Sequence, residues 1–408
     1  MNVPKLRFKE FNDEYNITKM NEIIDIIDGD RGNNYPKAND FYDSEFCLFL
    51  NAGNVTKNGF NFKNNQFITK EKDKKLRKGK LLINDIVLTT RGTVGNVAWF
   101  NEKIPYKNIR INSGMVINRI KEDGYLLPEY LYSYMKSPIF ENQVNKMNYG
   151  SAQPQLTVSG INKFNIQYPT IDEQKKVSTI MLLFDKKIEL QSKKIEDLKL
   201  FKKGLINKVI NELTFYKKIE LSELGVTYTG LTGKTKEDFE NGESRYIPFV
   251  DILNNKINID ILPLVNIKKN EIQNKVRKYD LFFNTSSETA NEVGLCTTLN
   301  FDIENTYLNS FCFGYRINDV NKINNEYLNI LLHSNIYRKK ISILGQGFTR
   351  VNISKNKLMK IKVLIPSYKK QLEIVDVINI ENNKILLEES KLYKLQKLKK
   401  GLMQNMFV

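Results

Sequence analysis

Loops rich in threonine, serine, asparagine, glutamine and arginine occur at matching places in this chain of 408 residues. Residues 89–95 follow a strand-like run that begins at Asp85, and residues 284–291 follow one that begins at Asp280. A second pair of loops, residues 149–155 and 345–350, also occupies matching places. Arginine bonds guanine and asparagine or glutamine bonds adenine in the major groove, whereas serine and threonine bond bases or phosphates. The candidate DNA-binding side chains are Lys57, Asn58, Thr90, Arg91, Thr93, Ser151, Gln153, Gln155, Arg245, Thr285, Ser286, Ser287, Asn291, Gln346 and Arg350.

The two copies of the first loop share a frame but differ in sequence. The leading aspartate and a downstream glycine, Gly95 or Gly294, correspond, while the second loop is four residues longer. Any one of the polar residues could instead form a turn or face solvent, so the loops are proposed as sets. Two domains that bind different DNA sequences are expected to share the residues flanking each loop and to differ within the loop.

Residues for catalysis or metal binding are scarce. The single histidine, His333, and three scattered cysteines, Cys47, Cys296 and Cys312, supply neither a Ser-His-Asp triad nor a zinc site. The run from Gly230 to Lys234 lacks the earlier glycine that a phosphate-binding loop needs. Neither an Asn-Pro-Pro-aromatic tetrad nor a glycine-rich cofactor loop is present. We therefore expect no catalytic residue and no metal ligand.

The loops belong to a chain with an internal sequence repeat. Residues 156–204 recur as residues 351–401, and Pro169 and Pro366 each precede a Lys-Lys-Gly-Leu run at the same spacing. Ile111-Asn112-Ser113 likewise matches Leu308-Asn309-Ser310, and Arg119 matches Arg316. Two units of about 200 residues are too long for a solenoid repeat. The chain is a duplicated domain followed each time by a helix.

Each repeat ends in a helix of about 40 residues, roughly 60 Å long at the α-helical rise. Apolar residues recur at heptad spacing, interrupted by Gln191, Glu381 and Glu388. Such a seam pairs with another helix, and an antiparallel coiled coil of the two copies is expected. Each helix could instead pack on its own domain. The predicted seam residues are Val177, Met181, Phe184, Ile188, Ile195, Leu198, Ile374, Ile378, Ile385, Leu392 and Leu395.

The globular parts read as α+β, with short strands separated by Gly- and Asn-rich turns. Expected helices are 128–136 and 325–333. The expected fold is two similar α+β recognition domains joined by two long helices, as a pseudo-two-fold tandem duplication. The expected strands are 46–50, 85–89, 94–100, 114–120, 246–250, 280–284, 308–313 and 313–317, and the expected domains are 1–168, 169–212, 213–365 and 366–408.

The composition limits the kinds of partner and the location that the chain can have. Its formal net charge is +17, divided almost evenly between the halves, which favours a polyanion such as nucleic acid. An AT-rich genome could also account for part of the lysine excess. The N-terminus lacks a signal-peptide core, and no apolar run reaches ~18 residues. We expect a cytoplasmic, reducing location and no membrane contact.

The layout resembles the specificity (S) subunit of type I restriction–modification systems over the whole chain. The resemblance rests on the opening residues 4–11, on residues 156–169 followed by Glu173-Gln174, and on the long Lys/Glu helix ending in Lys-Lys-Gly-Leu. The second copy has Lys370-Gln371 in place of the Glu-Gln pair.

That resemblance implies a non-catalytic DNA-reading subunit with two target-recognition domains. Each domain would read one half of an asymmetric bipartite target in double-stranded DNA. The paired helices would fix the spacer and dock two modification (methyltransferase) subunits, with restriction subunits as further partners. S-adenosylmethionine, ATP and Mg would be bound by those partners, and none by this chain. The alternatives are a coiled-coil scaffold and an enzyme with an unrecognised site acting on DNA.

Overall fold

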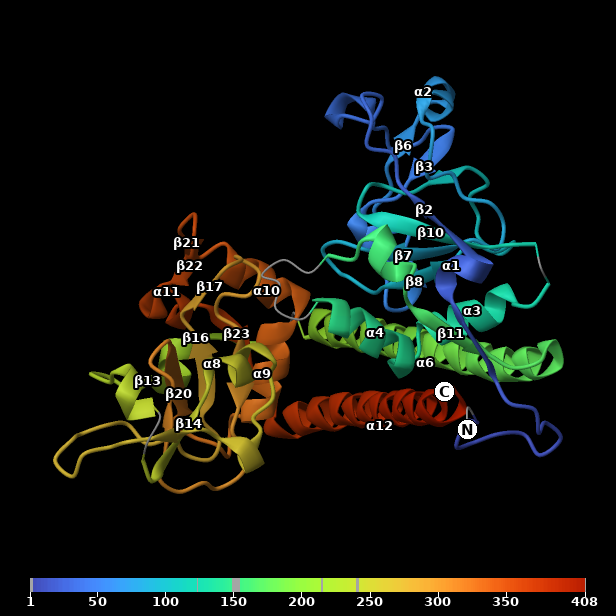
Figure 1. The fold of residues 1–408 in the computed structure, drawn as a ribbon. Helices are drawn as coiled ribbons and strands as arrows, with labels where there is room; N and C mark the ends of the chain where they lie inside the picture. The colour runs from blue at the N-terminus through green and yellow to red at the C-terminus, as the bar shows by residue number, and fades with distance from the viewer. Residues whose placement is uncertain (1–2, 123, 149–154, 214–215, 240–241, 408) are drawn as a thin grey trace. The chain divides into compact units, whose positions relative to one another are not determined.

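The computed structural model describes residues 3–122, 124–148, 155–213, 216–239 and 242–407 (Figure 1). The chain divides into two compact units: unit 1 is Met1–Ser192 with Ser390–Val408, and unit 2 is Lys193–Glu389. Each unit holds one globular region and a segment of both long helices, α6 (Ile171–Glu212) and α12 (Tyr368–Met406). The four-segment domain division expected from the sequence cuts the chain differently, and its boundaries stay a prediction.

The globular region of unit 1 contains short strands and helices in mixed order. Two 3-10 turns, Ala38–Asp40 and Ala52–Asn54, lie among them. The elements are β1 (Asn16–Lys19), α1 (Met20–Ile23), β2 (Ile24–Asp28), β3 (Cys47–Phe49), β4 (Val55–Thr56), β5 (Gly59–Phe60), β6 (Phe67–Ile68), α2 (Lys70–Lys75), β7 (Ile86–Thr89), β8 (Val97–Trp99), β9 (Ile109–Arg110), β10 (Met115–Ile120), α3 (Pro128–Met135), α4 (Pro138–Asn148), α5 (Val158–Ile161) and β11 (Asn165–Tyr168).

Unit 2 has a related order of elements, with additional short strands in its loops. Its 3-10 turns are Lys236–Phe239 and Ile259–Ile261. The elements are β12 (Lys218–Glu220), α7 (Leu221–Leu224), β13 (Gly225–Thr229), β14 (Ser244–Ile247), α8 (Phe249–Leu253), β15 (Leu264–Val265), β16 (Leu281–Asn284), β17 (Ser286–Ser287), β18 (Cys296–Thr298), β19 (Thr306–Leu308), β20 (Cys312–Ile317), α9 (Asn325–His333), α10 (Asn335–Ser342), β21 (Gly345–Gln346), β22 (Val351–Ile353), α11 (Lys355–Met359) and β23 (Lys362–Leu364).

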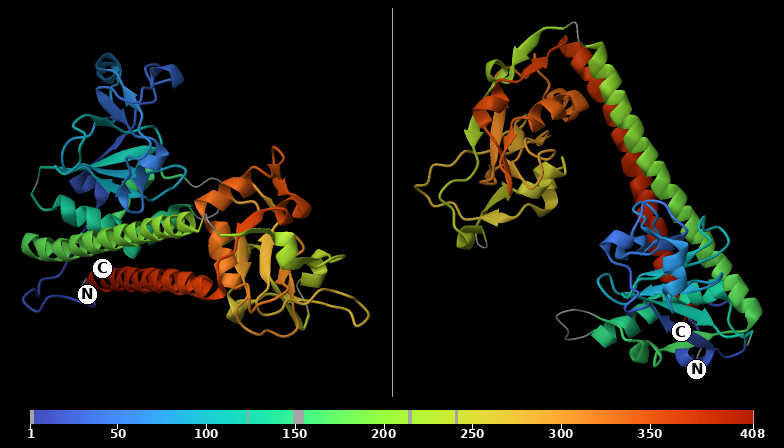
Figure 2. Two further views of the ribbon diagram at one scale, coloured as in Figure 1. Left: turned by 180° about the vertical axis from the view of Figure 1, so that it is seen from behind. Right: turned by 90° about the horizontal axis from the view of Figure 1, so that it is seen from above.

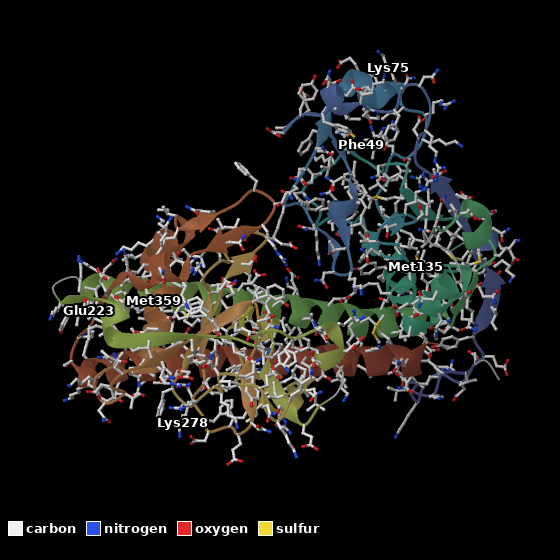
Figure 3. All side chains as sticks on the ribbon, turned by 90° about the vertical axis from the view of Figure 1, so that its left-hand side faces the viewer. Phe49, Lys75, Met135, Glu223, Lys278 and Met359 are labelled. Carbon is white, nitrogen blue, oxygen red and sulfur yellow. The ribbon has the colours of Figure 1, made fainter. Side chains whose placement is uncertain are left out.

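Three sheets of unit 1 have counterparts of the same strand order in unit 2, which confirms the tandem duplication of an α+β domain, whereas β4-β5 of unit 1 and β17-β22-β21 of unit 2 have no counterpart among the described residues. The four-stranded sheet β2-β10-β7-β8 of unit 1 has its counterpart in β13-β20-β16-β18 of unit 2. The pair β1-β11 corresponds to β12-β23, and β6-β3-β9 corresponds to β15-β14-β19. In both three-stranded sheets one pairing is parallel and the other antiparallel. Figure 3 shows the side chains, among them the buried Phe49 and Met135 of unit 1 and the buried Met359 of unit 2.

Three strands expected from the sequence were wrong in their extent. The run 94–100 is a strand only over Val97–Trp99, because Gly95 N donates to Thr89 O (3.0 Å) in the turn after β7. The run 246–250 is a strand only to Ile247, and helix α8 begins at Phe249 after Pro248. The run 308–313 is two strands, because Cys312 N donates to Asn309 O (3.1 Å) in a turn between β19 and β20. The expected helices 128–136 and 325–333 are α3 and α9.

A buried aspartate bonded by a partly exposed arginine supports the main sheet in each unit. In unit 1, Arg119 Nε and Nη2 donate to the two carboxylate oxygens of Asp85 at 2.8 and 2.7 Å. In unit 2, Arg316 makes the same two bonds to Asp280 at 2.9 and 2.7 Å. These hydrogen bonds raise the pKa of each guanidinium above its usual value. The duplicated aspartates are therefore structural and position the loop that follows each strand.

A buried glutamine ties the start of each long helix to the globular region. Gln174 accepts from Leu127 N (2.9 Å) and donates to the carbonyls of Tyr125 and Pro169. Gln371 repeats the arrangement with Asn324 N (2.9 Å) and the carbonyls of Lys322 and Pro366. Both amides thus hold the turn before α3 or α9 against the helix.

The neighbouring residue differs between the copies for a structural reason. Glu173 is buried and accepts two bonds from Arg7, at 2.9 and 2.7 Å, and one from Tyr15. Arg7 lies in the N-terminal segment, which also bonds α12 through Leu6 N and Asn405 O (2.8 Å). Lys370, at the matching place in unit 2, forms an exposed pair with Glu373 (3.2 Å) instead.

Segments of α6 and α12 run antiparallel within each unit (Figure 2). In unit 1, Lys399 of α12 bonds Asp185 of α6 at 2.5 Å, while Met406 near the end of α12 lies by the start of α6, where Tyr15 bonds both Met406 O and Glu173. In unit 2, Lys194 bonds Glu388 (3.1 Å) and Lys202 bonds Asn382 (3.0 Å). Later residues of one helix thus meet earlier residues of the other, as an antiparallel coiled coil requires.

The predicted seam residues all lie on sheltered faces of their helices. The glutamates that interrupt the seam are themselves buried, and Glu388 is paired with Lys194 and Glu381 with Lys384. A polar pair inside an apolar seam favours one register. The buried seam side chains are Val177, Met181, Ile195, Ile374, Ile378 and Ile385, and the partly buried ones are Phe184, Ile188, Leu198, Leu392 and Leu395.

Gly29 and Gly230, which the sequence repeat pairs, each lie against the backbone of a matching turn. A Cβ atom on Gly29 would stand 2.3 Å from Asn112 O, and one on Gly230 would stand 2.1 Å from Asn309 O. Both distances are far below van der Waals contact, and a backbone carbonyl cannot rotate away. No side chain is therefore tolerated at either position without a backbone shift.

We expect Gly29→Ala to destabilise unit 1 and Gly230→Ala to destabilise unit 2, each by about 1–3 kcal/mol. The matched controls are Gly204→Ala and Gly401→Ala in the long helices, where a Cβ meets nothing within 4 Å. Those two substitutions should stabilise by about 0.5–1 kcal/mol, because alanine is the better helix former. Urea denaturation followed by circular dichroism measures all four. Equal effects at Gly230 and Gly401 would contradict the close approach.

Candidate nucleic-acid interface

The two polar loops of unit 1 meet beside the end of strand β7. Thr90 N donates to Gly114 O (2.8 Å), and Thr90 O accepts from Leu156 N (3.0 Å). The next residue, Arg91, forms an antiparallel bridge with Gln155. With the Gln155 amide oxygen turned toward the guanidinium, it accepts from Arg91 Nε and Nη2 at 3.2 and 2.9 Å. Arg91 is exposed, so its guanidinium is oriented by Gln155 and still open to solvent.

An open depression of about 780 Å³ lies next to this loop. The β4–β5 turn contributes Lys57 and Asn58, the loop after β7 contributes Gly92 and Thr93, and α4 contributes Asn145. The wall is held by Asn96, whose Nδ2 donates to Val55 O at 3.1 Å. Three predicted DNA-binding residues, Lys57, Asn58 and Thr93, are thus gathered on one rim, although they lie on separate loops in sequence.

The loops of unit 2 meet in the same way and build a small sheet, β17-β22-β21. Thr285 N donates to Phe311 O (3.1 Å), and Thr285 O accepts from Ile353 N (2.9 Å), as Thr90 does with its own partners in unit 1. Ser286 pairs with Asn352 in the ladder, and Gln346 pairs with Asn352 from the other side. The backbone hydrogen bonds at the start of the loops are the same in the two units, and the loops differ in sequence and structure after that point.

The candidates of unit 2 divide by exposure. Asn291, Gln346 and Arg350 are exposed, whereas Ser286 and Ser287 are buried. Ser287 Oγ donates to Glu292 Oε2 at 2.8 Å. Thr90 in unit 1 is buried as well. Among the described residues, the Ser286 hydroxyl finds no hydrogen-bond partner, so only Ser287 is tied to its loop by a side-chain bond.

The exposed tip of the 345–350 loop carries an aromatic residue that sequence reasoning missed. Phe348 is fully exposed, and Arg350 lies over the ring of Phe311 at 6.0 Å. Phe311 itself is more than half exposed. Apolar side chains at such positions can wedge between base steps, and arginine can bond guanine. A phenylalanine between Gly347 and Thr349 in a polar loop was the available signal.

Of three further candidates, one lies on another sheet and two lie outside the described residues. Arg245 is exposed on β14, which belongs to the sheet β15-β14-β19 and not to the sheet that the loops build. Ser151 and Gln153 lie outside the described residues. All fifteen candidates stay predictions as DNA contacts.

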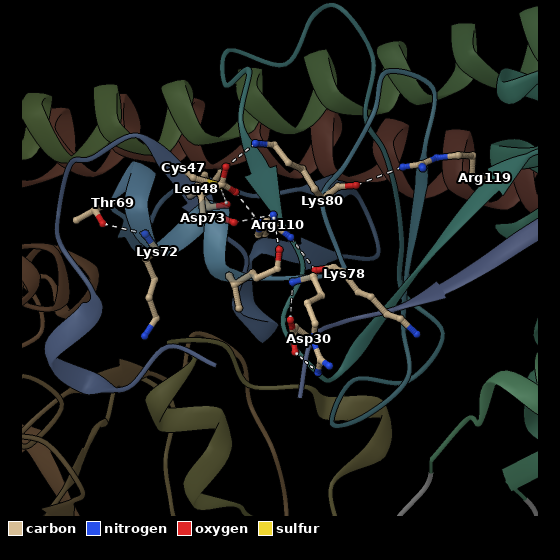
Figure 4. Close-up of polar contacts among 12 residues, drawn as sticks. Asp30, Cys47, Leu48, Thr69, Lys72, Asp73, Lys78, Lys80, Arg110 and Arg119 are labelled. Carbon is tan, nitrogen blue, oxygen red and sulfur yellow. Dashed lines mark hydrogen bonds and ion pairs between the residues drawn. The ribbon is translucent and has the colours of Figure 1, made fainter. Parts of the chain in front are cut away.

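Some of the positive charge is structural rather than available to a ligand. Arg110 is buried in unit 1, and its guanidinium donates to Asp73 Oδ1 (2.6 Å) and to the carbonyls of Asp73, Leu76 and Lys78 (Figure 4). Lys80 reaches the other oxygen of Asp73 at 2.5 Å. These bonds attach α2 to β9. Arg110 and Arg119 therefore support the fold, and the exposed lysines and exposed arginines such as Arg91 carry the charge that faces solvent.

Neither a metal cluster nor a membrane span is found within the described ranges. His, Cys, Asp and Glu side chains there form no group of three that could hold a metal ion. Among the same residues, no helix is both long and apolar enough to cross a membrane. His333 is partly buried on α9 with Nδ1 2.9 Å from Asn329 O, and burial lowers the pKa of its imidazole to about 4.

Comparison with known proteins gives the class to which this fold and its loops belong. Residues 12–200 and 215–397 each match the type I restriction modification DNA specificity domain. Together these ranges cover most of the chain. The chain belongs to the family of type I restriction–modification specificity subunits.

Two curated relatives come from Methanocaldococcus jannaschii. The type I restriction enzyme MjaIX specificity subunit is 33% identical over 127 residues, covering 30% of this chain and 28% of the relative. The MjaVIII specificity subunit is 22% identical over 310 residues, covering 70% of this chain and 69% of the relative. The chain thus matches under a third of the first relative's length and about two thirds of the second's.

Solved structures share the fold. The S subunit of a type I restriction–modification system from M. genitalium superposes with a TM-score of 0.56 at 15% identity, over 100% of this chain and 99% of that one. A chain from the structure described as the structural basis underlying complex assembly and conformational transition of the type I R-M system gives 0.59 at 14% identity, over 96% and 97%. At these identities the likeness shows the fold alone.

Proposed function

We propose that this chain is the DNA-reading subunit of a type I restriction–modification complex. The loops of unit 1 read one half of a bipartite, asymmetric target in double-stranded DNA, and the loops of unit 2 read the other half. The observation that carries this proposal is that the same backbone hydrogen bonds position the start of the loops in both units, while the loop sequences differ. Thr90 and Thr285 accept from Leu156 and Ile353 in the same way, yet the residues that follow are unrelated.

Physical reasoning supports two readers on one chain. A single recognition domain contacts few base pairs, whereas two linked domains make the second contact effectively intramolecular. The net charge of +17 favours the phosphate backbone, whose contribution to affinity falls steeply with salt. The helices α6 and α12, each about 60 Å long, are long enough to accompany a spacer of about one turn of DNA.

The chemistry is assigned to partners. We propose that α6 and α12 dock two modification subunits, which bind S-adenosylmethionine and methylate adenine at N6 on a flipped base. Restriction subunits that use ATP and Mg are the further partners. This chain contributes recognition, and it is proposed to be non-catalytic and to bind no cofactor itself.

Methylome sequencing of cells with and without this chain tests the proposal. We expect one bipartite N6-methyladenine motif to disappear when the chain is removed and to return on complementation. The purified chain alone should neither methylate nor cleave DNA. An unchanged methylome in cells that express the modification subunits, or modification of DNA by the chain alone, would contradict the assignment.

A further inference from the structure

Unit 1 contains a partly buried charge cluster between its two helix segments and the end of α3. Asp185 of α6 accepts from Lys399 of α12 at 2.5 Å and from Lys136 at 3.2 Å. The Lys136 ammonium also lies over the ring of Tyr132 at 4.8 Å. Trp99 completes the packing, with its ring 6.0 Å from that of Tyr132. One carboxylate thus holds α6 and α12 together beneath a wall of large side chains.

The same place in unit 2 has lost its carboxylate. Lys202 occupies the position of Lys399, but the residue that corresponds to Asp185 is Asn382. Lys202 Nζ donates to Asn382 Oδ1 at 3.0 Å, so the geometry of the contact is kept while its negative charge is absent. Burial and the neighbouring Lys199 lower the pKa of Lys202. A half-buried ammonium without a bonded counter-ion is costly.

The wall of large side chains is also missing in unit 2. Trp99, Tyr132 and Lys136 correspond in sheet register and helix position to Thr298, Asn329 and His333. All three replacements are smaller or shorter, and they line a half-open pocket of about 420 Å³. A volume of this size lies within the range of small-ligand sites, roughly 300–1,000 Å³.

The charge on the pocket wall is positive. Lys202, Lys203 and Lys256 line it, against one carboxylate, Glu326. That carboxylate already accepts from the amides of Asn300 (2.5 Å) and Asn379 (2.9 Å). The imidazole of His333 is neutral at pH 7, because burial lowers its pKa to about 4. The lysines therefore line a cavity whose wall also carries asparagine side chains, several of which already donate to protein partners.

We propose that this pocket of unit 2 binds a small oxyanion, of the phosphate or carboxylate class, at Lys202. The anion lies beside Asn382 and supplies the negative charge that the Asp185 carboxylate supplies in unit 1. It bonds the Lys202 ammonium, with Lys203 and Lys256 at the rim, and so joins α6 to α12 within unit 2. The site is independent of the DNA-reading loops, and its occupant stabilises the folded unit in proportion to its concentration.

Titration of the full-length chain with inorganic phosphate tests this site. Calorimetry at constant ionic strength should show one saturable event. Asn382→Asp supplies an internal carboxylate and should weaken that event by at least about ten-fold. The matched control is Asn383→Asp, an exposed neighbour on α12 with the same change in charge, which should bind phosphate as the wild type does.

Further arms separate the outcomes. Lys202→Met should abolish the event, with circular dichroism to check folding, and Asn382→Asp remains informative if that variant does not fold. A parallel titration with sodium acetate distinguishes the classes: binding of both ions indicates a general oxyanion site, and binding of phosphate alone indicates a phosphate site. The proposal is overturned if neither ion binds saturably. It is also overturned if Asn382→Asp and Asn383→Asp bind phosphate equally well.

Discussion

Replacing Ile385 with aspartate is expected to lower the free energy of unfolding of unit 2 by about 4 kcal/mol or more. Ile385 on α12 is only 6% exposed, so the change removes a buried apolar side chain and buries a carboxylate. The new charge would also lie one turn from Glu381 and Glu388, which are buried on the same face of the helix. Like charges at these spacings repel each other.

The measurement is urea denaturation followed by two probes. Far-UV circular dichroism reports both units, whereas the fluorescence of Trp99, the single tryptophan, reports unit 1. Ile385→Asp should shift the transition seen by circular dichroism more than the one seen by fluorescence. Ile188→Asp, at a partly buried place on α6 in unit 1, should act on the fluorescence transition with a smaller effect.

Leu386→Asp is the matched control for the helix seam. Leu386 neighbours Ile385 on α12 but is 52% exposed, so the same new charge should change stability by only about 0.5 kcal/mol. If Ile385→Asp unfolds no more readily than Leu386→Asp, the seam has been placed on the wrong face of the helix.

The second large effect is expected in DNA recognition. Replacing Phe348 and Arg350 together with alanine should reduce affinity for the cognate target by roughly 30-fold or more, since each good base contact contributes about 1–3 kcal/mol. The half-site read by unit 2 should become degenerate, while the half-site of unit 1 stays specific. Both side chains are exposed, so the fold should keep its stability.

The converse variant, Arg91→Ala with Thr93→Ala, should relax only the half-site of unit 1. Competition binding at fixed salt, with targets randomised in one half at a time, separates the two results. Lys360→Ala serves as the charge control, because Lys360 is an exposed cation after α11 that lies outside both loops. It should weaken binding uniformly and leave the preference for each half-site unchanged. Loss of both half-sites in either loop variant would contradict the division of labour between the units.

The duplication and the helices could be predicted from the sequence because their signals are local. Heptad spacing and the matched Pro169 and Pro366 indicated α6 and α12, and α3 and α9 were placed almost to the residue. Residues 246–250 show the limit of local reasoning. Their apolar run suits a strand, but Pro248 cannot donate to a ladder, and a helix begins directly after it.

The loops were identified from the sequence as sets, but their geometry was not. The pattern favoured Thr90, Ser286 and Ser287 as readers, yet their side chains are buried. It passed over Phe348, because exposure is not encoded in residue type. Which polar residue faces solvent depends on ladder pairings such as Ser286 with Asn352, which join segments more than 60 residues apart.

The sequence by itself determined that this chain is a repeated α+β unit with a long helix after each copy, since periodicity and spacing act over neighbouring residues. Only the tertiary structure decided which charged side chains form ion pairs and which have no bonded counter-ion. Asp85 binds Arg119, and Asp185 binds Lys399 across 214 residues. Asn382 leaves Lys202 beside an open pocket in unit 2. Such partners meet only when the chain folds, because their energy depends on distance and burial, and a linear sequence specifies neither directly.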